Sequence, residues 1–85
     1  MILTGAEIDT LVALVERGPL TAGNIPSKVG RDGLITARLA AQVVIDKRDQ
    51  HYAATQAGLE WYLNHFGAGN IADARTNRIM RQQLP

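Results

Sequence analysis

Cysteine is absent from this 85-residue chain, so neither a disulfide framework nor a thiolate metal site holds the fold. Aromatic residues make up only 5% of it, and the one serine, Ser27, has no histidine near it in the sequence. Nucleophilic catalysis therefore has no visible basis. His51 and His65 lack cysteines or paired carboxylates at ligand spacing, which argues against a metal site. We expect no enzyme activity and no cofactor.

Long apolar runs are also missing, although 46% of the residues are apolar. No stretch approaches the ~20 residues that cross a bilayer, and the first residues lack the basic and then apolar order of a signal peptide. We therefore expect a cytoplasmic protein without membrane association. Nine basic and eight acidic side chains give a net charge of +1, so any affinity for phosphate must come from local sorting of charge.

A single small domain is predicted, because a chain of this length buries only about 60 to 65 per cent of its unfolded surface. Thr4 and Glu7 fit a reciprocal capping box, which predicts the start of a first helix. Gly18 and Pro19 are typical of its end. Thr10 falls outside the predicted buried face. That face consists of apolar residues at helical spacing, namely Ile8, Leu11, Val12, Leu14 and Val15.

A second helix is predicted after a very short strand at Leu20. Thr21 is placed to cap this helix, which would run through Ile25 to Val29. Pro26 would lie in its first turns, where a missing backbone N–H costs least. Gly30 would end it and allow a sharp turn to the next helix.

A third helix is predicted over residues 31–42, with Ile35 and Leu39 on its buried side. Arg31 would lie at its start and Arg38 on a flank. Its outer face would be small and mostly uncharged, formed by Gly33, Thr36, Ala37 and Ala40. Such a face predicts few direct contacts to bases. It would equally suit close approach of another protein surface.

A β-hairpin follows. Its first strand is predicted at residues 43–45, its charged tip at 46–50 and its returning strand at 51–54. Thr55 can then cap another helix. The buried side of this helix is predicted to consist of Leu59, Tyr62, Leu63 and Phe66.

The order of a helix, a charged two-stranded ribbon, an aromatic residue, a threonine, a glycine and another helix resembles the winged helix-turn-helix superfamily. The chain looks most like bacterial regulators of the multiple-antibiotic-resistance type. Tyr52, Thr55 and Gly58 carry the resemblance, which extends from about Glu7 to Phe66. It implies a mainly α fold with a small β-hairpin (α+β), made of a three-helix core and a wing, with two C-terminal helices after them, and it places the winged helix domain at residues 1–66.

The resemblance also implies a function, namely a DNA-binding transcriptional regulator of bacterial or phage origin. The third helix would enter a major groove of double-stranded DNA, and the wing would lie on the adjacent backbone. The residues that would contact DNA are Arg31, Thr36, Arg38, Lys47 and Arg48. For the tip residues the alternative is a solvated hairpin tip, because Asp46 and Asp49 partly cancel its field.

Residues 67–70 are rich in glycine and predict a hinge, and residues 71–85 predict a last helix capped by Asn70. Arg75, Arg78 and Arg81 recur at a spacing of three and form a basic stripe on that helix. The stripe could be a solvated face, a contact between two chains of a homodimer, or a phosphate contact. Trp61 lies off the predicted apolar face of its helix, so the last helix or a partner chain should cover it.

Two other functions fit the same residues. A winged helix that binds protein instead of DNA is favoured by the nearly neutral charge and by the small outer face of the third helix. The second alternative is binding of structured RNA through the same basic residues. The target sequence, any effector and the pathway leave no trace in the sequence.

Overall fold

A computed structural model describes residues 2–45 and 48–67 of the protein. Over these residues the fold is α+β, with three α-helices and a small three-stranded antiparallel sheet. The elements follow in the order α1 (Gly5–Arg17), β1 (Leu20–Thr21), the 3₁₀ turn η1 (Ala22–Asn24), α2 (Lys28–Thr36), β2 (Ala40–Val43), β3 (His51–Ala54) and α3 (Gln56–Phe66).

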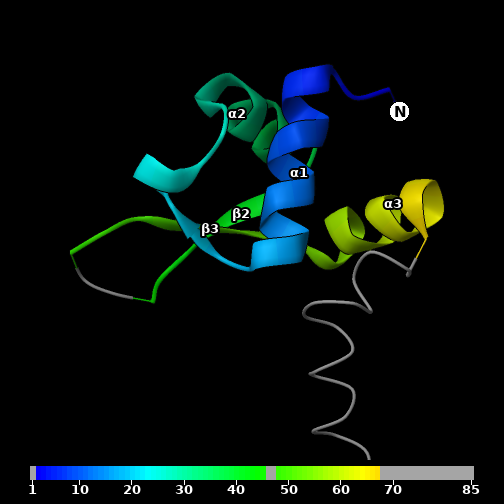
Figure 1. The fold of residues 1–85 in the computed structure, drawn as a ribbon. Coiled ribbons are helices and arrows are strands. Elements are labelled where there is room, and N and C mark those ends of the chain that lie inside the picture. Colours follow the sequence, from blue (N-terminus) through cyan, green and yellow to red (C-terminus); the bar gives the residue numbers. More distant parts are fainter. Residues whose placement is uncertain (1, 46–47, 68–85) are drawn as a thin grey trace, which may run out of the picture.

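The sheet has the strand order β1-β3-β2, with β3 in the middle. Tyr52 of β3 is paired with Leu20 of β1 on one side and with Gln42 of β2 on the other. In Figure 1 the β2–β3 hairpin extends to one side of α1 and α3 extends to the opposite side. We therefore distinguish an α2 and hairpin side of the fold from an α1 and α3 side.

The predicted start and end of α1 are confirmed. The backbone N–H of Glu7 donates to the Thr4 hydroxyl (3.2 Å) and the Thr4 N–H donates to the Glu7 carboxylate (2.8 Å), which completes the capping box. Gly18 ends the helix with a φ of 91°. The prediction for Thr10 is wrong, because its side chain is fully buried and its hydroxyl donates to the Ser27 carbonyl (3.4 Å).

The core lies where α1 meets α2, β3 and α3. Tyr62 is fully buried in it, and its hydroxyl donates to the Glu16 carboxylate (2.7 Å), so the polar end of this ring is satisfied. Full burial of an aliphatic side chain is worth about 1.5–3 kcal/mol. The other core residues are Leu3, Leu11, Leu14, Val15, Ile25, Leu34, Leu39, Ala40 and Tyr52.

The predicted second helix is wrong. Its residues up to Ser27 form the η1 turn and a loop, and only Lys28 and Val29 are helical, as the first residues of α2. Thr21 makes no capping hydrogen bond to η1 but accepts from the side-chain amide of Asn24 (3.0 Å). The α-helix begins only after Ser27, whose side chain accepts from the Gly30 N–H (2.9 Å). Gly30 does not end a helix. It is buried within α2, where a Cβ atom would overlap the carbonyl of Ala6 in α1.

The predicted third helix is correct in its first part only, because α2 ends at Thr36 instead of Gln42. Arg38 follows the helix at a φ of 64°, its N–H donates to Ile35 O (3.0 Å), and the Leu39 N–H donates to Leu34 O (2.8 Å). This pair of hydrogen bonds is a Schellman motif, in which the apolar side chains before and after the turn meet. Leu34 and Leu39 are accordingly in the core, and Ile35, predicted to be buried, is partly exposed.

The hairpin is confirmed, but its first strand lies earlier in the chain than predicted. β3 has the predicted bounds. β2 runs from Ala40 to Val43 and thus begins three residues before the predicted strand at 43–45. Ala40, expected on the outer face of a helix, is therefore buried in the core, and Ala37 packs against it. Val44 and Ile45 follow β2 and are exposed.

The predicted cap of α3 is also confirmed, since the Thr55 hydroxyl accepts from the Gly58 N–H (3.1 Å). The predicted apolar face is correct for Tyr62 and in part for Leu59, but Leu63 and Phe66 are substantially exposed. Gly67, at a φ of 75°, caps the end of α3. The remainder of the predicted hinge and the predicted last helix lie outside the described residues.

Candidate nucleic-acid interface

The solvent-facing side of α2 is the first part of the candidate interface. Asp32 lies near its centre, and the exposed residues follow a helical spacing, namely Lys28, Val29, Asp32, Ile35 and Thr36. Val29 is 80% exposed. One cation, one carboxylate and two aliphatic side chains make this face neutral and partly apolar, which differs from the glycine and alanine face predicted from the sequence.

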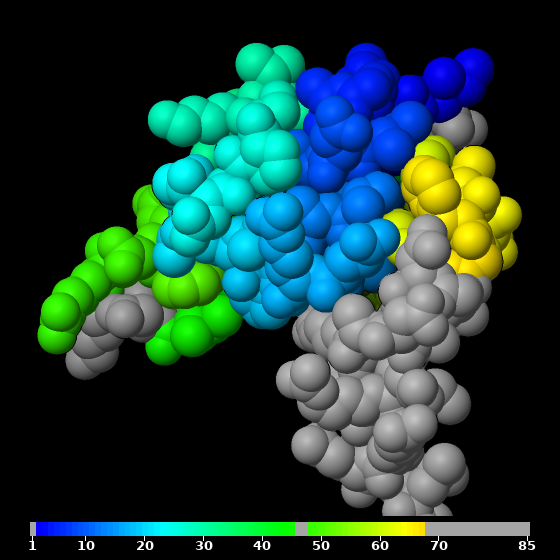
Figure 2. Space-filling view, viewed as in Figure 1, coloured from blue at the N-terminus to red at the C-terminus, as the bar shows by residue number. Residues whose placement is uncertain are grey.

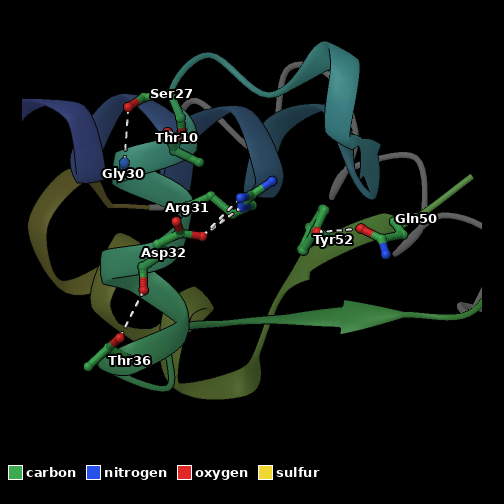
Figure 3. A network of polar contacts seen from close by, with 8 residues as sticks. All are labelled: Thr10, Ser27, Gly30, Arg31, Asp32, Thr36, Gln50 and Tyr52. Carbon is green, nitrogen blue, oxygen red and sulfur yellow. Dashed lines mark hydrogen bonds and ion pairs between the residues drawn. The ribbon is translucent and has the colours of Figure 1, made fainter.

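Arg31 lies at the edge of this face and joins α2 to the sheet (Figure 3). Its guanidinium lies over the ring of Tyr52 in β3, 4.8 Å from the ring centroid, which is a cation–π contact. The same group pairs with the Asp32 carboxylate at 3.0 Å. Because its side chain is only 16% exposed, Arg31 fixes α2 against the hairpin instead of reaching outward.

The ring of Tyr52 is held from both ends. Its hydroxyl donates to the Gln50 side chain (3.0 Å), and the residue is buried as part of the core. Gln50 begins the return from the hairpin tip and its carbonyl accepts from the Ala22 N–H (3.2 Å). Arg31, Tyr52 and Gln50 therefore connect α2, the middle strand and the base of the hairpin tip into one unit.

Arg38 lies at the junction of α2 and β2, and its left-handed backbone directs the chain from the helix into the strand. Thr55 fixes this junction, because its hydroxyl donates to the Arg38 carbonyl (2.8 Å) and its N–H donates to the Leu39 carbonyl (3.0 Å). The Arg38 residue is exposed. It therefore presents a cation from a backbone position that is held by hydrogen bonds.

The hairpin supplies the remaining cation of the described interface. Arg48 is exposed at the tip, beside Asp49. Val44 is 90% exposed and Ile45 is also exposed, so aliphatic side chains precede the charged tip. Figure 2 shows the hairpin projecting from the body of the protein, well apart from α3. Lys47, predicted as a contact, lies outside the described residues.

The fold distributes the acidic and basic residues of a nearly neutral chain unevenly over its two sides. The acidic residues Asp9 and Glu16 are on α1 and Glu60 is on α3, and Arg17 is the only lysine or arginine of these two helices. A further acidic residue of α1, Glu7, lies against Gly33 of α2. The α2 and hairpin side thus holds most of the described cations. Its basic residues are Lys28, Arg31, Arg38 and Arg48, against the acidic residues Asp32 and Asp49.

The residues predicted to contact DNA differ in their exposure in the structure. Arg38, Thr36 and Arg48 are exposed on the α2 and hairpin side, but the Thr36 hydroxyl donates to the Asp32 carbonyl (3.0 Å) within its own helix. Arg31 is a packing residue. Sequence reasoning missed Lys28 and Val29, which it placed inside a different helix. Ser27 followed by an apolar helical pattern was the signal that could have shown them.

Trp61 does not belong to the α2 and hairpin side. It lies on α3, packs partly against the core, and its ring stacks on that of His65 with centroids 3.7 Å apart. Its indole Nε1 is buried and, among the residues that the structure describes, has no hydrogen-bond partner. Trp61 is thus partly covered by its own helix and the core. The last helix that was predicted to cover it, with the stripe Arg75, Arg78 and Arg81, lies outside the described residues.

In the part of the chain that the structure describes, no group of three His, Cys, Asp or Glu side chains is placed to hold a metal ion. None of the described helices is long and apolar enough to span a membrane.

Comparison of the chain with protein-family models, with curated proteins and with solved structures finds no match.

Proposed function

We propose that the protein is a small winged helix DNA-binding protein, a transcriptional regulator of bacterial or phage origin. The element order supports this proposal: a long helix, a short strand, a turn, a helix and a two-stranded hairpin follow one another as they do in that superfamily. In this assignment η1 occupies the place of the first helix of the helix-turn-helix unit. α2 is the recognition helix and the β2–β3 hairpin is the wing.

The sorting of charge is the observation that carries the proposal. DNA attracts Lys and Arg through its phosphates, and this term is independent of sequence. Exposed Lys28, Arg38 and Arg48 lie on three successive parts of the chain, the first turn of α2, its end and the hairpin tip. Asp9, Glu16 and Glu60 lie on α1 and α3, outside these parts of the chain, and this uneven distribution would favour approach of the α2 and hairpin side to the duplex.

The first turn of α2 also suits this role. It contains no acidic residue, and base contacts of recognition helices come mainly from their N-terminal residues. Lys28 is exposed there. Few hydrogen-bonding side chains accompany it, so binding should depend mostly on phosphate contacts and should weaken steeply with salt.

Titration of a fluorescent duplex over a series of salt concentrations tests the proposal. We expect binding at low salt, and we expect Lys28→Gln, Arg38→Gln and Arg48→Gln each to lower the slope of log K against log salt by about one. Arg17→Gln removes an exposed arginine from the acidic side and should leave the slope nearly unchanged. Absence of salt-sensitive binding in the micromolar range would remove DNA binding as the function.

A protein-binding role is the second candidate, and exposed aliphatic side chains favour it. Val29 and Ile35 on α2, and Val44 and Ile45 on the hairpin, are exposed in the free chain. Contiguous exposed apolar side chains can mark sites of protein interaction. If no duplex binds, protein binding becomes the preferred function. Competition between duplex DNA and structured RNA tests the remaining alternative, which is RNA binding.

The proposed regulator would act as a homodimer, as the symmetry of most soluble assemblies suggests. Exposed Leu63 and Phe66 on α3 offer apolar surface away from the proposed DNA side. Sedimentation velocity of the full chain tests this, and a monomer at high micromolar concentration would contradict it.

A further inference from the structure

We propose that α2 reads thymine methyl groups through Val29 and Ile35, so that the protein prefers thymine-rich duplex. This inference rests on the proposed DNA binding and names the duplex chemistry that the α2 face fits. It concerns which feature of the bases is recognised, whereas the charge sorting concerns only the phosphates.

Two polar side chains of the α2 face make hydrogen bonds within the protein. The Asp32 carboxylate pairs with Arg31 at 3.0 Å, and the Thr36 hydroxyl donates to the Asp32 carbonyl at 3.0 Å (Figure 3). A carboxylate in this position would also be repelled by the phosphates. Among the charged side chains of this face, only Lys28 is suited to a hydrogen bond with a base edge.

Two aliphatic side chains remain available on the same face. Val29 lies in the first turn of α2, is 80% exposed, and is next to Lys28 in the chain. Ile35 lies on the other flank of the face, almost two turns further along. The thymine C5-methyl is the apolar group that the major groove displays, and it distinguishes A·T from the other pairs.

Charge complementarity selects duplex DNA as the occupant of this apolar face. Lys28 stands beside Val29, Arg38 follows the end of the helix, and both are exposed. Cations at both ends of the helix match phosphates along the edges of a major groove, which would hold the aliphatic side chains against the base edges. An apolar protein surface would offer these cations no partner.

An alternating A·T duplex, compared with the same duplex carrying uracil in place of thymine, provides the test. Every register of the first duplex displays thymine methyls, and the second differs only in lacking them, with the same charge and pairing groups. We expect the uracil duplex to bind about fourfold more weakly for each methyl contacted, which corresponds to ~0.8 kcal/mol per buried carbon. Val29→Ala should weaken binding to the thymine duplex and reduce the ratio of the two affinities.

Ile2→Ala is the control, because it truncates an aliphatic side chain that is 97% exposed but lies before α1, outside α2 and the hairpin. We expect it to keep the wild-type ratio. Equal affinity for the two duplexes would overturn the inference and leave the proposed DNA binding in place. Loss of the ratio in Ile2→Ala but not in Val29→Ala would also overturn it. No salt-sensitive binding to either duplex would instead overturn the proposed function, so the two failures are distinguishable.

Discussion

The two sides of this small protein use their side chains differently. On the α1 and α3 side, Leu11, Leu14 and Tyr62 are almost completely buried, and the charge is mainly acidic. On the α2 and hairpin side, Val29 and Val44 stand in solvent among the described cations. Both sides contribute to the single small core, since Leu34 of α2 and Tyr52 of β3 are buried in it, but the α2 and hairpin side also presents exposed cations and aliphatic side chains.

The joint between the two sides is made of close contacts. Gly30 lets α2 approach the backbone of α1, and Gly58 lets α3 approach the Leu39 carbonyl. Arg31 stacks on Tyr52 and ties α2 to the sheet. At Gly30 and Gly58 there is no space for a larger side chain, in contrast to the exposed residues of α2 such as Val29.

Matched truncations on the two sides should give the largest difference in stability. Leu11→Ala removes a fully buried side chain and should lower the free energy of unfolding by about 2–5 kcal/mol. Val29→Ala, on the exposed face, should change it by no more than roughly 0.5 kcal/mol. Urea unfolding followed by Trp61 fluorescence measures both values. Similar losses for the two variants would show that Val29 is buried against the protein instead of exposed to solvent.

Glycine substitutions test the joint itself. Gly30→Ala places a Cβ atom on the Ala6 carbonyl and should cost about 1–3 kcal/mol of unfolding free energy, since backbone cannot yield as a flexible side chain does. Gly5→Ala is the control, because nothing lies within 4 Å of its added Cβ. Thermal unfolding should show a lower Tm for the first variant and an equal or higher Tm for the second. An unchanged Tm for Gly30→Ala would mean that the helices do not approach so closely.

Loss of the Arg31 contact should loosen the hairpin relative to α2. We expect Arg31→Gln to lower the free energy of unfolding by about 0.5–2 kcal/mol, because it removes the cation over Tyr52 and the partner of Asp32. Amide hydrogen exchange in β3 should become faster. Arg17→Gln serves as the reference, and equal exchange in the two variants would contradict a role of Arg31 in holding the sheet.

The smallest expected effect concerns the turn after α2. Arg38 has a φ of 64°, which costs a residue with a Cβ atom about 1–2 kcal/mol. Arg38→Gly should therefore raise the free energy of unfolding by roughly 0.5–1 kcal/mol, after the greater entropy of glycine in the unfolded chain is subtracted. Arg38→Ala keeps the strain and should give no such gain. Equal stability of the glycine and alanine variants would exclude the left-handed turn.

Local signals in the sequence were sufficient for α1, β3 and the start of α3. The reciprocal cap of Thr4 and Glu7, and the cap of Thr55, act within one turn of the chain, so the residues that form them are close in sequence. The region from 21 to 43 could not be assigned in this way. Its competing signals were a threonine, a proline and a glycine that each suggest a boundary at a different residue.

Tertiary contacts decided that region. Gly30 looked like a helix end, but its lack of a side chain serves the packing of α2 on α1. Arg38 carries no sign of a turn, because glycine or asparagine is the usual residue at such a position. Burial of Leu34 and Leu39 on either side of it favours the turn over a longer helix.

The sequence alone therefore determined the caps that begin α1 and α3, the returning strand and the nearly neutral total charge, since each depends on residue types at short separations or on composition. Only the tertiary structure decided where α2 begins and ends, that Arg31 is used in packing, and that the described cations gather mainly beside the hairpin. These features depend on which side chains meet across the core, and a surface charge has a position in space only after that packing is fixed.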